Sequence, residues 1–252
     1  MRKFRKPLMF SLALLPAAAL AAVFTCLYQF EMYPAEVLEQ AAAQLGSVEL
    51  IVVISVIQVM MYALVCGFFG YILADRTGLW KPFRFERDKV IRTLLISAAA
   101  GVLFSLDYWT FGAVIPGIRE ATAAGMTLYG VIASVLYGGI IEEVMMRLFV
   151  MSLAAFLIRK LFFRKTDREH LPEGVFIAAN LTAALLFAAG HLPATLVTFG
   201  ELTPLLLFRC FLLNGGFGLM FGRIYRTCGL GYAMLSHAAV HCVSKLIWLL
   251  LI

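Results

Sequence analysis

The chain has 252 residues, of which 62% are hydrophobic and 14% are charged, and its formal net charge is +6. A soluble globular domain usually has about 45–50% apolar and about 25% charged residues, so this composition excludes an ordinary soluble enzyme, a disordered protein and a DNA-binding domain. The mean hydropathy of +0.91 indicates a chain that buries most of its surface in lipid.

Seven apolar runs are long enough to cross a bilayer, which takes about 20 mostly apolar residues. They cover approximately residues 8–30, 50–73, 94–115, 126–163, 175–199, 205–224 and 230–252. The basic start before the first run is also typical of a signal peptide, but the length of that run favours an uncleaved span. The runs are continuous rather than alternating, and backbone groups in lipid must be satisfied within a helix. The sequence therefore predicts an all-α, polytopic membrane helix bundle with about seven transmembrane helices, and no β-barrel.

Lysine and arginine residues gather in alternate loops. With the N-terminus placed in the cytoplasm, 17 of the 21 lie in cytoplasmic segments, whereas only Arg119 lies outside and three lie within spans. This bias predicts a multi-pass protein of the cell membrane with a cytoplasmic N-terminus and an external C-terminus. It also accounts for the basic balance without a nucleic-acid partner.

Ionisable residues within apolar runs are costly in lipid and are therefore candidates for function. Three of them have a structural interpretation. Arg209 and Lys245 lie near span ends, where a long side chain can reach the interface. Asp107 lies beside two aromatic residues of the kind found at membrane interfaces. The five cysteines form no CxxC pair, and we interpret them as small hydrophobic residues.

The fourth run contains two adjacent carboxylates, Glu142 and Glu143, followed by Arg147. Glu143 and Arg147 are at i,i+4 with the glutamate on the N-terminal side, which is the favourable orientation for an ion pair on a helix. Glu142 points about 100° away from Glu143 and has no local partner. The spacing therefore assigns Glu143 and Arg147 to structure and Glu142 to chemistry. A purely structural cluster of ion pairs is the alternative.

Three of the four histidines also lie in apolar runs. His191 ends one run, and His237 and His241 share one helix face at i,i+4, a spacing used for metal binding or catalysis. A carboxylate beside an imidazole or a metal can take a proton from water, and imidazole N–H groups can stabilise an oxyanion. These residues predict water activation within the membrane, with a peptide bond as the substrate. A rise of about 1.5 Å per residue puts His191 further outward than Glu142 unless its helix is tilted.

Other signatures are absent from the sequence. It contains no HExxH, no GxSxG and no GxGD motif, and no glycine-rich phosphate loop. Gly218 and Gly222 form a GxxxG spacing, which is typical of close helix packing rather than of a site.

Three motifs in chain order resemble a known family. EEVMMR at 142–147, FAAGH at 187–191 and HAAVH at 237–241 are similar to the EExxxR, FxxxH and HxxxN-type motifs of the CAAX prenyl protease and bacteriocin-processing family, also called Abi. The resemblance covers about residues 126–252 and implies an intramembrane endopeptidase.

The resemblance implies a role for each matched residue. Glu142 with His191 would activate the hydrolytic water, and His237 with His241 would hold the oxyanion. Glu143 and Arg147 complete the first motif. The family usually has Asn or Asp where this chain has His241.

The resemblance leaves the mechanism open between a metalloprotease and a metal-independent glutamate protease. The additional imidazole of His241 favours a metal such as Zn²⁺, whose ligands would come from Glu142, His191, His237 and His241. We expect one membrane domain, 1–252, with N-terminal spans in 1–125 and the catalytic part in 126–252. The expected partners are the lipid bilayer and a peptide or membrane-protein substrate.

Family members trim prenylated CAAX proteins or act in peptide maturation, bacteriocin immunity or the control of surface proteins. The alternative is a non-proteolytic membrane protein that binds a peptide or a protein, in immunity or as a scaffold. A transporter ranks third, because the sequence shows no inverted repeats.

Overall fold

The computed structural model describes residues 2–252, with side chains for residues 4–252, and this part of the chain is helical with no strand. The first half forms α1 (Arg2–Met32), α2 (Ala35–Leu45), α3 (Val48–Thr77), α4 (Arg87–Ser105), η1 (Leu106–Tyr108), η2 (Phe111–Ala113) and α5 (Ile118–Ala124). The second half forms α6 (Leu128–Ala133), η3 (Ser134–Glu142), η4 (Val144–Met151), α7 (Ser152–Phe162), η5 (Arg168–His170), α8 (Glu173–Gly190), α9 (Leu192–Phe199), α10 (Pro204–Cys210), η6 (Phe211–Gly215), α11 (Gly216–Cys228) and α12 (Leu230–Leu251). The all-α prediction is confirmed.

Six helical segments of the described chain are long and apolar enough to cross a membrane. They are Phe4–Met32, Val48–Thr77, Arg87–Ala113, Glu173–Phe199, Pro204–Cys228 and Leu230–Leu251. The remaining predicted span, 126–163, is helical without a break from 128 to 162, but α6 and α7 flank two π-helical stretches, η3 and η4. The predicted count of about seven is therefore close. π-Helices are rare and often occur at functional sites. Glu142 is the last residue of η3.

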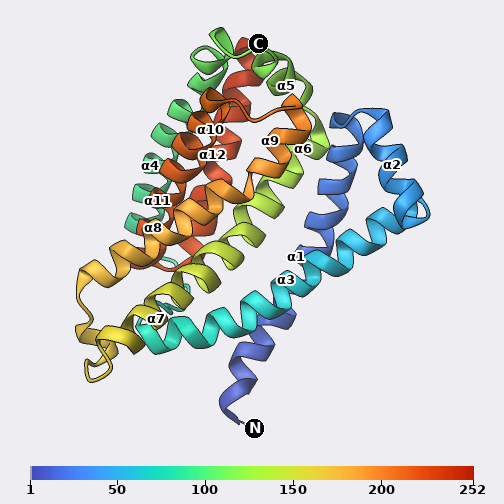
Figure 1. Ribbon diagram of the computed structural model, residues 1–252. Coiled ribbons are helices and arrows are strands. Elements are labelled where there is room, and N and C mark those ends of the chain that lie inside the picture. The colour runs from blue at the N-terminus through green and yellow to red at the C-terminus, as the bar shows by residue number, and fades with distance from the viewer. Residues whose placement is uncertain (1) are drawn as a thin grey trace.

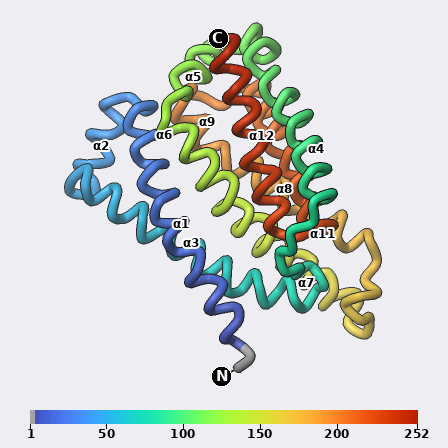
Figure 2. The backbone as a smooth tube through the Cα atoms, turned by 180° about the vertical axis from the view of Figure 1, so that it is seen from behind, coloured from blue at the N-terminus to red at the C-terminus, as the bar shows by residue number. Residues whose placement is uncertain are grey.

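The helices α1 and α3 are joined by α2 and cross each other obliquely, and α3 continues along the lower end of the bundle to α7 (Figure 1). In that bundle α12 packs against α4, α11 and η3, and α8 packs against α7, α11 and η4. Figure 2 shows α12 and α4 side by side on the face opposite to α8. The π-helical stretch lies between the α1–α3 pair and the other helices, so that it contacts both.

Small side chains let α1 and α3 approach each other and the π-helical stretch. The buried cluster between these elements consists of Ala18, Ala21, Ala22, Val59, Ala63 and Ile141. Further along α3, a Cβ atom on Gly70 would lie 3.0 Å from the carbonyl oxygen of Leu148. Helices in lipid associate largely through such close van der Waals packing. The packing fixes α1 and α3 against the segment that carries Glu142.

Several segments that the cation bias assigns to the cytoplasm contact one another at one end of the bundle. The amine of Lys81 donates to the carbonyl oxygens of Arg226 and Thr227 at 2.8 Å each, and Nη1 of Arg168 lies 3.3 Å from Oδ1 of Asp75. The N-terminus lies at this end and the C-terminus at the other (Figures 1 and 2). The gathering agrees with the predicted loop grouping, and the side of the membrane that each end faces stays a prediction.

Arg209, for which the sequence predicts a position near the interface, pairs with Asp107. Its Nε and Nη2 donate to the two carboxylate oxygens at 2.8 and 2.5 Å, and Asp107 is buried. The pair connects α10 to η1, which directly follows α4, and gives Asp107 a structural role. Lys245 also points inward, with Nζ 3.5 Å from the carbonyl oxygen of Gly125. Both cations thus have partners within the protein.

Candidate active site

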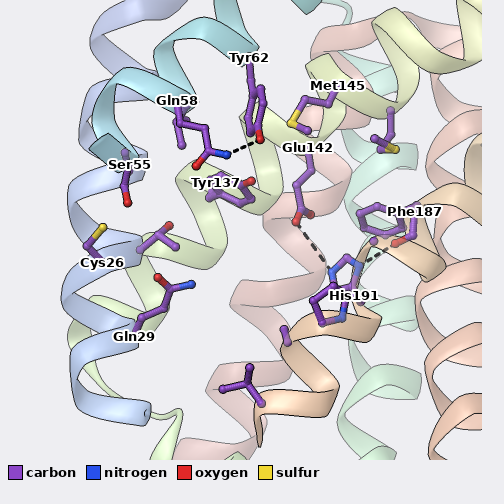
Figure 3. Close-up of a pocket in the computed structure, with 18 of the residues that line it drawn as sticks. Cys26, Gln29, Ser55, Gln58, Tyr62, Tyr137, Glu142, Met145, Phe187 and His191 are labelled. Atoms are coloured by element: carbon purple, nitrogen blue, oxygen red, sulfur yellow. Dashed lines mark hydrogen bonds and ion pairs between the residues drawn. The ribbon is translucent and has the colours of Figure 1, made fainter. Parts of the chain in front are cut away.

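Glu142, His191 and His237 line one cavity of about 290 Å³, although they come from three separate segments. Glu142 ends η3, His191 directly follows α8, and His237 lies within α12. Oε1 of Glu142 lies 3.8 Å from Nε2 of His191, and Oε2 lies 3.9 Å from Nε2 of His237. Figure 3 shows the carboxylate of Glu142 directed at the ring of His191. The two oxygens of one carboxylate therefore face two different imidazoles.

Fixed acceptors set the orientation of both imidazoles. Nδ1 of His191 lies 2.8 Å from the carbonyl oxygen of Phe187, which can only accept, so we assign the hydrogen to Nδ1. Nδ1 of His237 lies 2.9 Å from Oε1 of Glu143, and an ionised Glu143 likewise accepts that hydrogen. In the neutral rings, Nε2 of each histidine then presents a lone pair toward Glu142. Such partners fix both the tautomer and the orientation of a functional histidine.

Glu143 and Arg147 form the i,i+4 ion pair that their spacing predicts. Both side chains are buried, and Nη1 of Arg147 lies 3.3 Å from Oε1 of Glu143. Nη2 of Arg147 donates to the carbonyl oxygen of Gly218 at 3.1 Å. The guanidinium carbon lies 4.6 Å from the ring centroid of Phe187 and 5.4 Å from that of Phe221. Arg147 thus connects η4 to α8 and α11 by charge, hydrogen bonding and cation–π contact.

Gly218 explains how α11 comes close enough for this contact. A Cβ atom there would lie 3.2 Å from Cα of Ala184 in α8, and Gly222 one turn later faces Asn180 of the same helix. The GxxxG spacing therefore marks close helix packing, as predicted from the sequence.

His237 is held on both faces of its ring. It stacks on Phe221 with 4.3 Å between ring centroids and an interplanar angle of 17°, and on His241 with 5.0 Å and 27°. Phe104 meets His241 edge-on, with 6.0 Å between centroids. The predicted i,i+4 pair thus forms one stack, and only His237 contacts Glu143 directly.

Gly138 is a site residue that the sequence analysis missed. A Cβ atom there would lie 3.2 Å from Nε2 of His241 and 3.4 Å from Nε2 of His237. Any other residue would therefore narrow the space that both imidazoles face. The adjacent glycines at 138 and 139, four and three residues before Glu142, were the available signal.

The residues predicted to bind a metal do not form a ready metal site. A carboxylate and imidazole nitrogens are donors that suit Zn²⁺. Among residues 2–252, however, no three His, Cys, Asp or Glu side chains are placed so that they could hold a metal ion together. The predicted ligands Glu142, His191, His237 and His241 meet at the site without such an arrangement.

A second cavity, of about 470 Å³, borders Glu142 and His191 on the side of α1 and α3. Its lining includes polar side chains of these two helices, namely Thr25, Gln29, Ser55, Gln58 and Tyr62. Figure 3 shows Gln29, Ser55 and Gln58 across the open space from Glu142 and His191. The first half of the chain therefore contributes to the site, although no residue of these two helices was a candidate from the sequence.

Comparison with known proteins identifies one related family. Residues 124–243 match a family described as type II CAAX prenyl endopeptidase Rce1-like. Neither a curated protein nor a solved structure matches the chain. The matched residues include all three motifs of the site and exclude α1, α3 and the polar side chains that they contribute. The resemblance seen in the motifs is thereby confirmed at the level of the family.

Proposed function

With residues 124–243 assigned to the type II CAAX prenyl endopeptidase Rce1-like family, we propose that the protein is an intramembrane endopeptidase that uses a water activated by Glu142 and His191. The observation that carries the proposal is the approach of Oε1 of Glu142 to Nε2 of His191, at 3.8 Å. It supports a specific position for the water, because neither atom carries a hydrogen when Glu142 is ionised and His191 is the Nδ1–H tautomer.

Two hydrogen-bond acceptors can lie this close together without repulsion when a donor between them bonds to both. A water about 2.8 Å from each atom donates one hydrogen to the carboxylate and the other to the imidazole. Both of its hydrogens then point at bases, and its lone pairs remain free to attack a carbonyl carbon. Glu142 and His191 thus bind and orient the nucleophile before the substrate reacts.

The hydrolysis follows from this arrangement. As the water oxygen bonds to the carbonyl carbon, Glu142 takes one of its protons. When the tetrahedral intermediate collapses, the C–N bond breaks and the proton passes from Glu142 to the leaving nitrogen. The second proton of the attacking water passes through Nε2 of His191 to the leaving amine, so the products are a carboxylate and an ammonium group, and Glu142 returns to its ionised form. The second oxygen of Glu142 lies 3.9 Å from Nε2 of His237.

We propose that His241, rather than His237, is the main residue that stabilises the oxyanion. Nδ1 of His237 is committed to Glu143, so the neutral His237 ring has no hydrogen on its outer nitrogen. The ring of His241 makes no hydrogen bond within residues 4–252, so its tautomer is free to present an N–H to the cavity. Donors aimed at the developing charge are commonly the largest electrostatic contribution to acyl transfer.

Hydrolysis by the purified protein in lipid vesicles tests the proposal. The probe is a quenched fluorogenic peptide that ends in a prenylated cysteine, two aliphatic residues and one further residue, and its unprenylated form is the second probe. We expect the wild type to cleave at least one of them and Glu142→Gln to lose a factor of about 10²–10⁴, the usual contribution of a general base. Glu49→Gln, on the exposed start of α3, is the matched control and should cleave as the wild type does.

Two outcomes would overturn the mechanism or the function. Cleavage by Glu142→Gln at the wild-type rate would remove Glu142 from the chemistry. Binding of the peptides by the wild type without any hydrolysis would favour the non-proteolytic alternative, a membrane protein that binds peptides.

A further inference from the structure

The polar side chains of the second membrane span face one cavity. Between residues 50 and 65 of α3, Ser55, Gln58 and Tyr62 are the only polar side chains, and all three line the cavity of about 470 Å³ that borders Glu142. Their i, i+3, i+7 spacing puts them on one face of the helix. The other side chains of this stretch are apolar, as lipid requires.

The first span repeats this pattern on the facing helix. Thr25 and Gln29 of α1 are one helical turn apart and line the same cavity. The hydroxyl of Thr25 is buried and has no hydrogen-bond partner. Nε2 of Gln58 donates to the hydroxyl of Tyr62 at 2.6 Å, which leaves the carbonyl oxygen of that amide for another partner. We call these five residues, Thr25, Gln29, Ser55, Gln58 and Tyr62, the α1–α3 polar wall.

Polar groups of this kind are costly in a membrane span unless they have a partner. Neither the ion pairs nor the stacked histidines explain why these five residues are polar. They also lie outside the residues that match the family. All five line the same cavity as Glu142, and Figure 3 shows Gln29, Ser55 and Gln58 across it from the carboxylate of Glu142, so a molecule bound in this cavity can reach both. Both hydrogen-bond donors and acceptors are present, which suits a ligand with both.

We propose that the α1–α3 polar wall binds the main chain of the substrate, as an extended peptide segment next to the bond that is cleaved. This inference rests on the proposed function. A peptide bond is open to attack only where the substrate is not helical, and in lipid its freed N–H and C=O groups then need new partners. Glutamine amides and hydroxyl groups supply these partners, and such main-chain hydrogen bonds do not depend on the side chains of the substrate.

Apolar side chains elsewhere in the lining of the cavity are suited to apolar side chains of the substrate. They include Met145 and Met146 of η4 and Leu186, Phe187, Ala194 and Val197 on α8 and α9. From Ser55 to Tyr62 the helix rises by about 10 Å, which matches about three residues of extended chain. The substrate class is thus a peptide with a short extended stretch, its main chain on α1 and α3 and its apolar side chains on η4, α8 and α9.

Glutamine-to-leucine substitutions test the wall without removing volume from it. Gln29→Leu, Gln58→Leu and the double variant keep the side-chain size and lose the hydrogen bonds. Gln44→Leu makes the same change on the exposed surface of α2 and is the matched control. Each is combined with Glu142→Gln, and binding of the fluorogenic peptide is measured in vesicles, so that the affinity does not depend on cleavage. Thermal unfolding of each variant shows whether it is folded.

A second probe replaces one amide next to the cleaved bond by an ester, which removes a main-chain N–H and keeps the side chains. We expect each single glutamine variant to bind the amide peptide about 3- to 10-fold more weakly, the effect of one hydrogen bond. The ester peptide should bind the wild-type wall more weakly by a similar factor and should lose little more in the glutamine variant that contacts this amide. Such non-additivity identifies a direct contact.

The outcomes separate this inference from the proposed function. If the folded wall variants bind the peptide as tightly as the Gln44→Leu control does, the α1–α3 polar wall does not bind the substrate. Cleavage by the wild type would still support the proposed endopeptidase function. Purely additive effects of the ester and the glutamine substitutions would also overturn the wall as a main-chain site. Loss of bound phospholipid with unchanged peptide affinity would assign the wall to a lipid head group and overturn the inference. If the wild type neither cleaves nor binds the peptide, the proposed endopeptidase function and the proposed role of the α1–α3 polar wall are both wrong.

Discussion

Oε1 of Glu143 lies 2.9 Å from Nδ1 of His237 and 3.3 Å from Nη1 of Arg147, so one buried carboxylate holds both an imidazole of the site and a guanidinium. Glu143 thereby links the chemistry-bearing face of α12 to the packing of η4. Glu142, the preceding residue, forms no ion pair with Arg147 and faces the cavity, where its two oxygens lie 3.8 and 3.9 Å from Nε2 of His191 and of His237. Two adjacent glutamates of one helical stretch therefore differ in what a substitution should do to the protein.

We expect Glu143→Gln to lower the amount of folded protein in the membrane, because it leaves Arg147 as an unpaired buried charge at a cost of about 3–5 kcal/mol. Glu142→Gln should leave the amount unchanged. Abundance and cleavage are measured side by side in both variants. Abundant, inactive Glu143→Gln together with normal cleavage by Glu142→Gln would show that the two roles are reversed.

We expect Gly138→Ala to inactivate the protein and Gly174→Ala, at the exposed start of α8, to leave it active. The new Cβ at 138 would press on Nε2 of His241 and of His237, whereas a Cβ at 174 would meet no other part of the protein within 4 Å. A displacement of catalytic groups by a fraction of an ångström to 1 Å costs on the order of 10² in rate. Alanine favours helix over glycine, so neither variant should lose helix by intrinsic propensity. Equal rates for both variants would mean that the imidazoles can shift freely.

Substitutions of His241 distinguish an oxyanion donor from a metal ligand. If His241 only donates a hydrogen bond, His241→Asn should keep or raise activity, and His241→Ala should lose about 10²–10³ in rate. If His241 is a metal ligand, both variants should lose bound metal and activity together. Cleavage and bound metal are measured in both. Normal cleavage by His241→Ala would exclude both roles and leave the stack on His237 as its function.

Reporter fusions at the two termini test the orientation. The cation bias predicts a cytoplasmic N-terminus and an external C-terminus, and the termini lie at opposite ends of the structure (Figure 1). We expect the two fusions to report opposite compartments, with the N-terminal fusion inside. A C-terminal fusion that reports the cytoplasm would contradict the predicted topology.

The sequence by itself determined the fold class and indicated which ionisable residues to examine as candidates for chemistry. Composition alone requires helices in lipid, because backbone groups there have no water to bind. The Glu143–Arg147 pair followed from the i,i+4 spacing, since helix geometry brings such residues together wherever the helix lies. The three motifs were also enough to indicate the family that the comparison then identified.

Only the tertiary structure decided how these residues meet. Counting residues along straight helices put His191 too far outward, but α8 runs obliquely across the bundle and ends beside Glu142 (Figure 1). The second contact of Glu143, the pairing of Arg209 with Asp107 and the polar wall on α1 and α3 were likewise not predictable. Each joins segments that are far apart in the chain. Tilt and rotation of membrane helices are set by their neighbours rather than by their own sequence, and these angles decide which polar faces point at one another.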